Sequence, residues 1–346
     1  MLANVPGARA QPGNFATPVS TGSFSRFEGA AAVGNLVVFT PHYADVVGVY
    51  DVSTGTFDAS TSTGSLTMDS KFVGAAAVGN LVVFAPLNAD VVGVYDASTG
   101  TFDASASTGS LTMDNKFAGA AAVGNLVVFA PHNADVVGVY DVSTGTFDAS
   151  TSTGSLTMTD KFVGAAAVGN LVVFAPYNAD VVGVYDVSTG TFDTSVSTGS
   201  LTMNAKFAGA AAVGNLVVFA PHYADVVGVY DVSTGTFDAS TTTGSLTMND
   251  KFIGAAAVGN LVVFAPQDAD VVGVYDVSTG TFDASTTTGS LTMNDKFDGA
   301  AAVGNLVVFA PHNAYVVGTF MIPSPPLPPP TSPPSPTPPP LLPPPL

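Results

Sequence analysis

The residues best suited to chemistry are four histidines, each of which directly follows a proline in a copy of the same motif. They are His42, His132, His222 and His312, and their equivalents elsewhere are Leu87, Tyr177 and Gln267. Imidazole nitrogens can bind metal ions or transfer protons. Because the histidines alternate with other residues from copy to copy, three of them are not expected to reach one zinc ion. Only His312 and His42 would be neighbours, if the two ends of the chain meet. We therefore predict no metal site and no cofactor, and we expect exposed histidines on loops.

A second set of ionisable residues is basic and recurs at a fixed spacing, often with an aspartate just before it. These residues could form a cationic crown that binds an anion or a sugar. They could instead form local Asp–Lys pairs on a solvated surface, each worth about 0–1 kcal/mol, and we favour this second interpretation. The set comprises Lys71, Lys116, Lys161, Lys206, Lys251 and Lys296, with Arg26 at the seventh position.

Aspartates recur in the same way, at Asp45, Asp51 and Asp58 and their copies. Asp51 opens the sequence DVSTG, where its carboxylate can accept hydrogen bonds from backbone N–H groups two residues further on. Calcium sites need several oxygens that converge on one point, and the spacing here gives no such loop. An active site also needs one asymmetric cluster of groups with different pKa values, whereas these groups come as near-copies. We therefore predict that the protein is not an enzyme.

The elements that must position these residues are read from a repeat of 45 residues, seven copies of which contain GAAAVGNLVVFAP or a near-copy. Within residues 71–115, an Ala-rich strand reaches a Gly-Asn hairpin signal, and LVVFAP then forms a strand that both faces bury. DVVGVYD and TFDASAS form a third and a more polar fourth strand, and no helical periodicity is present. Four antiparallel strands in each of seven units predict an all-β fold, a seven-bladed β-propeller.

The two ends of the chain support this prediction. The segment 14–23 aligns with a fourth strand that lacks the first three, and the segment 316–323 aligns with a third strand that lacks a fourth. The N-terminal strand is therefore expected to complete the last blade and close the ring. We predict a disordered N-terminus over residues 1–13, a propeller over 14–322 and a Pro-rich tail over 323–346.

The units resemble kelch repeats. LVVFAP stands at the position of the kelch second strand, and six residues separate Tyr50 from Phe57, as they separate Tyr from Trp in that family. Two features depart from the family, because Ala-Pro replaces the double glycine and Phe replaces Trp. The resemblance implies a propeller that binds partners through the loops of one face. Those loops carry most of the differences between the units.

Composition indicates which classes of partner are expected and bears on where the protein is located. The net charge of −18 would repel a phosphate backbone, so nucleic-acid binding is not expected. No apolar run reaches the ~20 residues of a membrane span, and no signal peptide is visible. The Pro-rich tail predicts an extended polyproline II spacer. A ligand for proline-binding domains is the less favoured alternative, because such ligands usually carry a flanking Arg or Lys and this tail has none. It resembles hydroxyproline-rich segments of plant and green-algal wall glycoproteins, which favours an extracellular setting, although the sequence does not fix the localisation.

We interpret the protein as a non-enzymatic binding or scaffold module that recognises a protein partner through one loop face. Carbohydrate binding or a structural role in an extracellular matrix is the alternative, and a propeller enzyme ranks third. The candidate binding residues are His42, Tyr43, His132, Tyr177, His222, Tyr223 and His312, together with Lys71, Lys116, Lys161, Lys206, Lys251 and Lys296.

Overall fold

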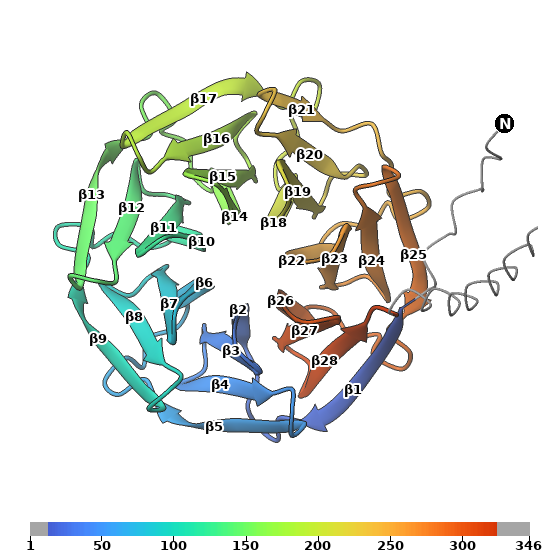
Figure 1. Cartoon of the computed structure of the whole chain (residues 1–346), viewed down its shortest axis with the longest axis horizontal. Helices are drawn as coiled ribbons and strands as arrows, with labels where there is room; N and C mark the ends of the chain where they lie inside the picture. The colour runs from blue at the N-terminus through green and yellow to red at the C-terminus, as the bar shows by residue number, and fades with distance from the viewer. Residues whose placement is uncertain (1–12, 324–346) are drawn as a thin grey trace, which may run out of the picture.

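The computed structural model describes residues 13–323, which form seven sheets arranged in a ring around a central axis (Figure 1). Each sheet has four antiparallel strands, and the described residues contain no helix. The predicted seven-bladed β-propeller is therefore confirmed. The predictions made for residues 1–12 and 324–346, including the polyproline tail, lie outside the described residues. No part of the described chain forms a helix long and apolar enough to cross a membrane.

Each blade runs outward from the axis in chain order. The first contains β2 (Phe27–Val33), β3 (Leu36–Pro41), β4 (Val46–Asp51) and β5 (Thr56–Ser62). The next five blades are β6 (Phe72–Val78), β7 (Leu81–Pro86), β8 (Val91–Asp96) and β9 (Thr101–Ser107); β10 (Phe117–Val123), β11 (Leu126–Pro131), β12 (Val136–Asp141) and β13 (Thr146–Ser152); β14 (Phe162–Val168), β15 (Leu171–Pro176), β16 (Val181–Asp186) and β17 (Thr191–Ser197); β18 (Phe207–Val213), β19 (Leu216–Pro221), β20 (Gly228–Asp231) and β21 (Thr236–Asp238); β22 (Phe252–Val258), β23 (Leu261–Pro266), β24 (Val271–Asp276) and β25 (Thr281–Thr287).

The last blade joins the two ends of the chain, as predicted. It consists of β26 (Phe297–Val303), β27 (Leu306–Pro311), β28 (Val316–Met321) and, as its outer strand, β1 (Asn14–Ser20). The pairing places Asn14 opposite Met321 and Phe15 opposite Phe320. Because every blade then has four strands, the ring closes with no blade left incomplete.

Glycine is required where neighbouring blades meet at the axis. A methyl group added to Gly74 would lie 2.5 Å from Cα of Gly119 in the next blade, and the other glycines of this ring make equally close approaches. Real carbon atoms cannot come this near, so only a residue without Cβ fits. The small residues of the repeated motif are thus explained by the narrow centre of the ring.

Apolar packing between blades forms the core. Between the first two blades, Val38 and Val47 pack with Phe72 and Phe84, and all four side chains are fully buried. The same arrangement recurs around the ring. The LVVF strands are therefore apolar on both faces, because each blade packs against the preceding blade on one face and the next blade on the other.

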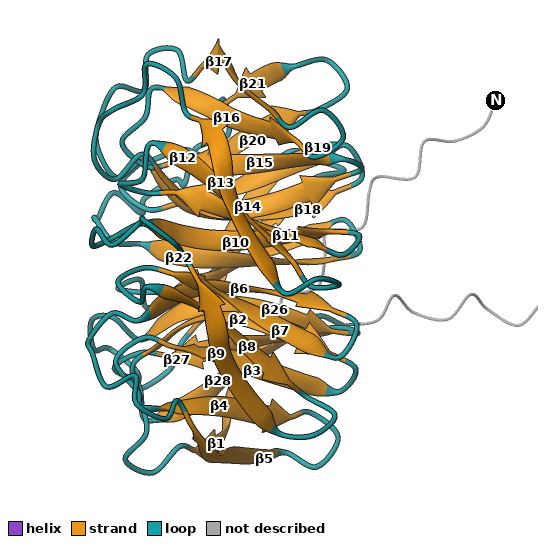
Figure 2. Cartoon of the chain, turned by 90° about the vertical axis from the view of Figure 1, so that its left-hand side faces the viewer, coloured by secondary structure: helices purple, strands orange, loops and turns teal. Residues whose placement is uncertain are grey.

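The propeller has two loop faces, which lie on opposite sides in the edge-on view (Figure 2). One face carries the β2–β3 hairpins and the DVSTG turns, which are nearly identical in every blade. There the backbone N–H of Ser53 donates a 2.8 Å hydrogen bond to Asp51, which confirms the predicted turn role of this carboxylate. We call the other face the variable face. It consists of the loops after β3 (residues 42–45 in the first blade), the segments that enter the next blade (residues 63–71) and the first residues of each inner strand.

Candidate functional site

The repeated lysines lie inside the variable face and not on its surface. Nζ of Lys71 lies 2.9 Å from Oδ1 of Asp45 and 2.8 Å from the carbonyl oxygen of Met68, and it also contacts the carbonyl oxygen of Tyr43. The side chain of Lys71 is fully buried. The interpretation of these lysines as solvated surface residues is therefore wrong. The same three contacts recur in full at Lys116, Lys161, Lys206, Lys251 and Lys296.

The lysine contacts connect neighbouring blades. Asp45 precedes β4 of the first blade, whereas Lys71 immediately precedes β6 of the second. A buried ammonium ion is tolerated only where hydrogen bonds replace its lost hydration, and the three oxygens provide that replacement. With no exposed surface, these lysines offer a partner nothing to contact, so they are left out of the binding surface proposed below.

Each buried lysine also holds a methionine in place at the rim of the variable face. The carbonyl of Met68 is fixed by Lys71, yet the Met68 side chain is 43% exposed. Six equivalent methionines form what we call the methionine ring. These methionines were not among the predicted binding residues, although the recurring SLTM before the lysines is a visible signal. The ring consists of Met68, Met113, Met158, Met203, Met248 and Met293, which are 40–43% exposed.

The histidines are more buried, and closer to their neighbours, than the sequence analysis predicted. His42 and His222 are 7% and 4% exposed. Tyr177 follows β15 in the fourth blade, and its ring centroid lies 6.4 Å from that of His132 in the third blade and 5.5 Å from that of His222 in the fifth. Exposed, well-separated loop histidines were therefore the wrong expectation. Their loops converge because they lie near the axis, where blades are crowded.

One junction between blades differs from the other six. There Tyr315 replaces the aspartate and Arg26 the lysine, so the buried ion pair is missing. The linking segment is also shorter, with three residues between Gly22 and Arg26 against six between Gly64 and Lys71. The Arg26 guanidinium instead lies over the ring of Tyr43, at 5.2 Å. This junction joins the last blade to the first.

Two histidines and two carboxylates meet at this junction, and we call them the junction cluster. The rings of His42 and His312 lie 6.1 Å apart, so the one predicted histidine pair is confirmed. Nδ1 of His42 lies 3.0 Å from Oε2 of Glu28, and Nδ1 of His312 lies 3.1 Å from Oδ2 of Asp298. Ligand atoms of Glu28, His42 and His312 all lie within 4.8 Å of one another.

Burial and the charges of neighbouring groups shift the pKa values of the junction cluster. It raises the pKa of Asp298 well above its usual range, and the nearby charge of Glu28 adds to this effect. Burial also acts to raise the pKa of Glu28, but the attraction of His42 and its hydrogen bond outweigh it and hold that pKa below the ordinary value. The pKa of His312 is lowered by burial, against the opposing charge of Glu28. The cluster thus contains one carboxyl that favours the neutral form beside one that favours the charged form.

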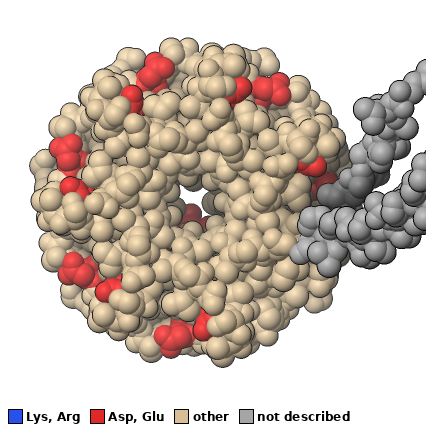
Figure 3. All heavy atoms as spheres, viewed as in Figure 1, with Lys and Arg blue, Asp and Glu red and all other residues tan. Residues whose placement is uncertain are grey.

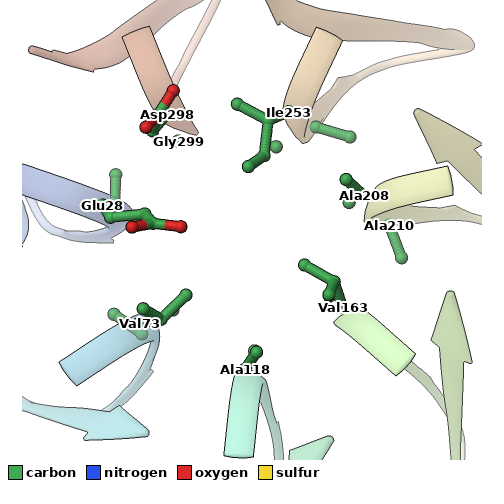
Figure 4. Close-up of a pocket in the computed structure, with 18 of the residues that line it drawn as sticks. Glu28, Val73, Ala118, Val163, Ala208, Ala210, Ile253, Asp298 and Gly299 are labelled. Carbon is green, nitrogen blue, oxygen red and sulfur yellow. The ribbon is translucent and has the colours of Figure 1, made fainter. Parts of the chain in front are cut away.

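Glu28 and Asp298 also line a cavity of about 100 Å³ on the axis of the ring. Figure 4 shows their carboxylates on adjacent blades, beside apolar residues at the equivalent position of the other blades. Those equivalents are Val73, Ala118, Val163, Ala208 and Ile253. Neither carboxylate was among the predicted site residues, because both directly precede an almost invariant motif. The signal was present, since Glu28 is the only glutamate in the chain.

Exposed charge on the described part of the propeller is almost entirely acidic. Figure 3 shows a hollow at the centre of the ring, acidic side chains around the rim and no lysine or arginine on the face in view. Within residues 13–323, Arg26 is the one cation that is exposed.

Comparisons with known proteins support the fold. No protein-family model and no curated protein matches the sequence. Among solved structures, virginiamycin B lyase from Staphylococcus aureus is similar with a TM-score of 0.72 and 13% identity, over 89% of this chain and 98% of that one. A streptogramin B lyase gives 0.71 and 15%, over 89% and 97%, and a chain of the mitotic checkpoint complex gives 0.62 and 12%, over 94% and 99%.

These neighbours include lyases and a component of a protein complex, so their likeness does not choose between an enzyme and a binding protein. The kelch resemblance stays a prediction. At these identities the comparisons show the fold alone, which is that of a β-propeller.

Proposed function

We propose that the protein is a non-enzymatic binding module that recognises a partner protein through the variable face. The observation that carries the proposal is the methionine ring, six large apolar side chains held on anchored loops and open to solvent. Propeller folds are commonly used for protein–protein interaction, which agrees with this role.

Methionine suits such a surface because its side chain is unbranched, flexible and polarisable, and so adapts to irregular apolar partners. Ordering a flexible loop at an interface costs free energy. Here the backbone of each methionine is already fixed by a buried lysine, as at Lys116 Nζ and the carbonyl of Met113, 2.9 Å apart. The methionine side chains can therefore still change conformation, while the buried lysines fix the backbone from which they project.

Chemical variation between blades supplies the means to distinguish one partner from another. The residues after the prolines are His, Leu, Tyr or Gln, and they contact one another across blades, as Tyr177 and His222 do. The opposite face repeats the same turns in each blade. A partner on the variable face would therefore meet a different surface at each point of the ring.

The charge of this surface indicates the kind of partner. Asp45 is more than half exposed, as are its equivalents, whereas the lysines that pair with them are buried. A complementary surface on the partner would be apolar and flanked by Lys or Arg. Carbohydrate binding remains the alternative, and no contact within residues 13–323 favours it over a protein.

Incorporation of photo-methionine tests the proposal directly, because six of the eight methionines belong to the ring. We expect irradiation in an extract of the source cells to crosslink a discrete basic protein at Met68 and its equivalents. Met321, which is 45% exposed on β28 and outside the ring, is the internal control. Crosslinks that occur equally at Met321, or a glycan-array signal unchanged by serine at all six ring positions, would contradict the proposal.

A further inference from the structure

We propose that Glu28, His42 and His312 bind one divalent transition-metal ion of the zinc class, with Asp298 as the residue that positions His312. This site lies at the junction of the last and first blades, beside the axial cavity. It is separate from the methionine ring, so the proposal does not rest on the proposed function.

The distances suit a metal ion. Zinc lies about 2.0–2.2 Å from nitrogen and carboxylate ligands in tetrahedral sites, so atoms that share one ion lie about 3.3–3.6 Å apart. The three ligand atoms lie within 4.8 Å of one another before any ion is bound. Side-chain rotations that shorten the longest of these separations by about 1 Å would bring all three atoms to bonding distance.

Unpartnered buried atoms point to a missing ligand. Among the described residues, Nε2 of His312 and Oδ1 of Asp298 are buried without a hydrogen-bond partner. Asp298 is only 5% exposed. An unsatisfied buried polar group costs about 1–3 kcal/mol, so a cluster of them is expected only where something else completes their bonding.

The pairing of histidine and carboxylate is the arrangement that metal sites use. A ligating imidazole commonly has its other ring nitrogen held by a carboxylate, which fixes the orientation of the ring. Asp298 Oδ2 contacts Nδ1 of His312 and so leaves Nε2 as the ligand. Nδ1 of His42 and Oε2 of Glu28 lie 3.0 Å apart, close to the separation of two atoms that bind the same ion.

The donor set selects the kind of ion. Two imidazoles and one carboxylate suit zinc and its neighbours in the first transition row. Calcium and magnesium prefer sites made of oxygen ligands. Three protein ligands also leave one coordination position open.

The other two histidines offer a matched control. His132 and His222 each face one aspartate, Asp160 and Asp250, at 3.3 and 3.1 Å, and Tyr177 lies between their rings. No second histidine joins either group within the described residues. They have the burial and charge of the junction cluster without its set of ligands.

Calorimetric titration of the purified full chain with Zn²⁺, and the visible spectrum with Co²⁺, test the proposal. We expect one ion per chain and the intense absorption of a low-coordinate cobalt site. The variants use residues that other blades carry at the same positions, so the fold should tolerate them: Glu28→Val, His42→Leu, His312→Gln and Asp298→Ala.

We expect His42→Leu, His312→Gln and Glu28→Val to abolish stoichiometric binding, and Asp298→Ala to weaken it about 10–100-fold, as loss of a positioning carboxylate does. His132→Gln should bind as the unmodified chain does. The proposal is overturned if the unmodified chain binds neither ion, if His42→Leu binds normally, or if His132→Gln loses binding to the same degree.

Discussion

Nζ of Lys71 lies 2.9 Å from Oδ1 of Asp45 in the preceding blade, with the ammonium fully buried and the carboxylate more than half exposed. The Lys71–Asp45 pair lies beneath the surface of the variable face. It joins two blades and fixes the loop that presents Met68, so the same contact serves both stability and the surface available to a partner.

Replacement of one buried lysine should destabilise the propeller. We expect Lys161→Met to lower the free energy of unfolding by about 2–4 kcal/mol, because hydrogen bonds to a charged group are lost and buried carbonyls are left unpaired. Asp135→Asn, which keeps an oxygen near Lys161 and removes the charge, should cost less. Urea denaturation of the purified variants measures both. Equal stability of Lys161→Met and the unmodified chain would show that the contacts contribute nothing.

A second change should stabilise the fold. The hydroxyl of Thr40 is buried without a hydrogen-bond partner, and every other blade has alanine at this position. We expect Thr40→Ala to raise the free energy of unfolding by about 1–2 kcal/mol. The reciprocal change Ala130→Thr serves as control and should lower it. A loss of stability in Thr40→Ala would mean that an ordered water satisfies the hydroxyl.

Alkaline pH should weaken the fold through Tyr177. Burial raises the pKa of Tyr177 from 10.0 to about 12, with further contributions from Tyr223 and Asp250. The folded state therefore holds this proton more tightly than the unfolded chain. The resulting stability is complete below pH 10 and is lost as the pH rises through about 12.

Tyr177→Phe should thus lose less stability between pH 8 and pH 11 than the unmodified chain in urea denaturation. Tyr315→Phe, at a residue that is 54% exposed, provides the control and should behave as the unmodified chain does. Identical alkaline loss in Tyr177→Phe and the unmodified chain would contradict the assignment.

The sequence was sufficient for the fold because a period of 45 residues and two incomplete ends specify how many blades exist and how they close. It was insufficient for the lysines. An aspartate directly before several of them suggested local pairs, whereas the actual partner of Lys71 is Asp45, 26 residues earlier in another blade. Only the arrangement of blades brings such residues together.

The junction cluster, too, could be predicted only in part from the sequence. Ring closure predicted that His42 and His312 would be neighbours, and they are. The separation of the other loops was misjudged, because crowding near the axis brings Tyr177 within reach of His222 in the next blade. Glu28 and Asp298 were overlooked because their importance depends on which strand ends face the axis, and the sequence pattern gives strand order without that detail.

The central claim is that a partner protein binds the methionine ring on the variable face. The most direct measurement is the affinity of the crosslinked partner, by calorimetry, for two variants of the full chain. One has serine at all six ring methionines, and the other has alanine at Ser53, Ser98, Ser143, Ser188, Ser233 and Ser278 in the turns of the opposite face. We predict at least a roughly hundredfold loss for the methionine variant, since each buried methionine at an interface is worth about 1.5–3 kcal/mol, and none for the serine variant. Equal affinities of the two variants would contradict the account.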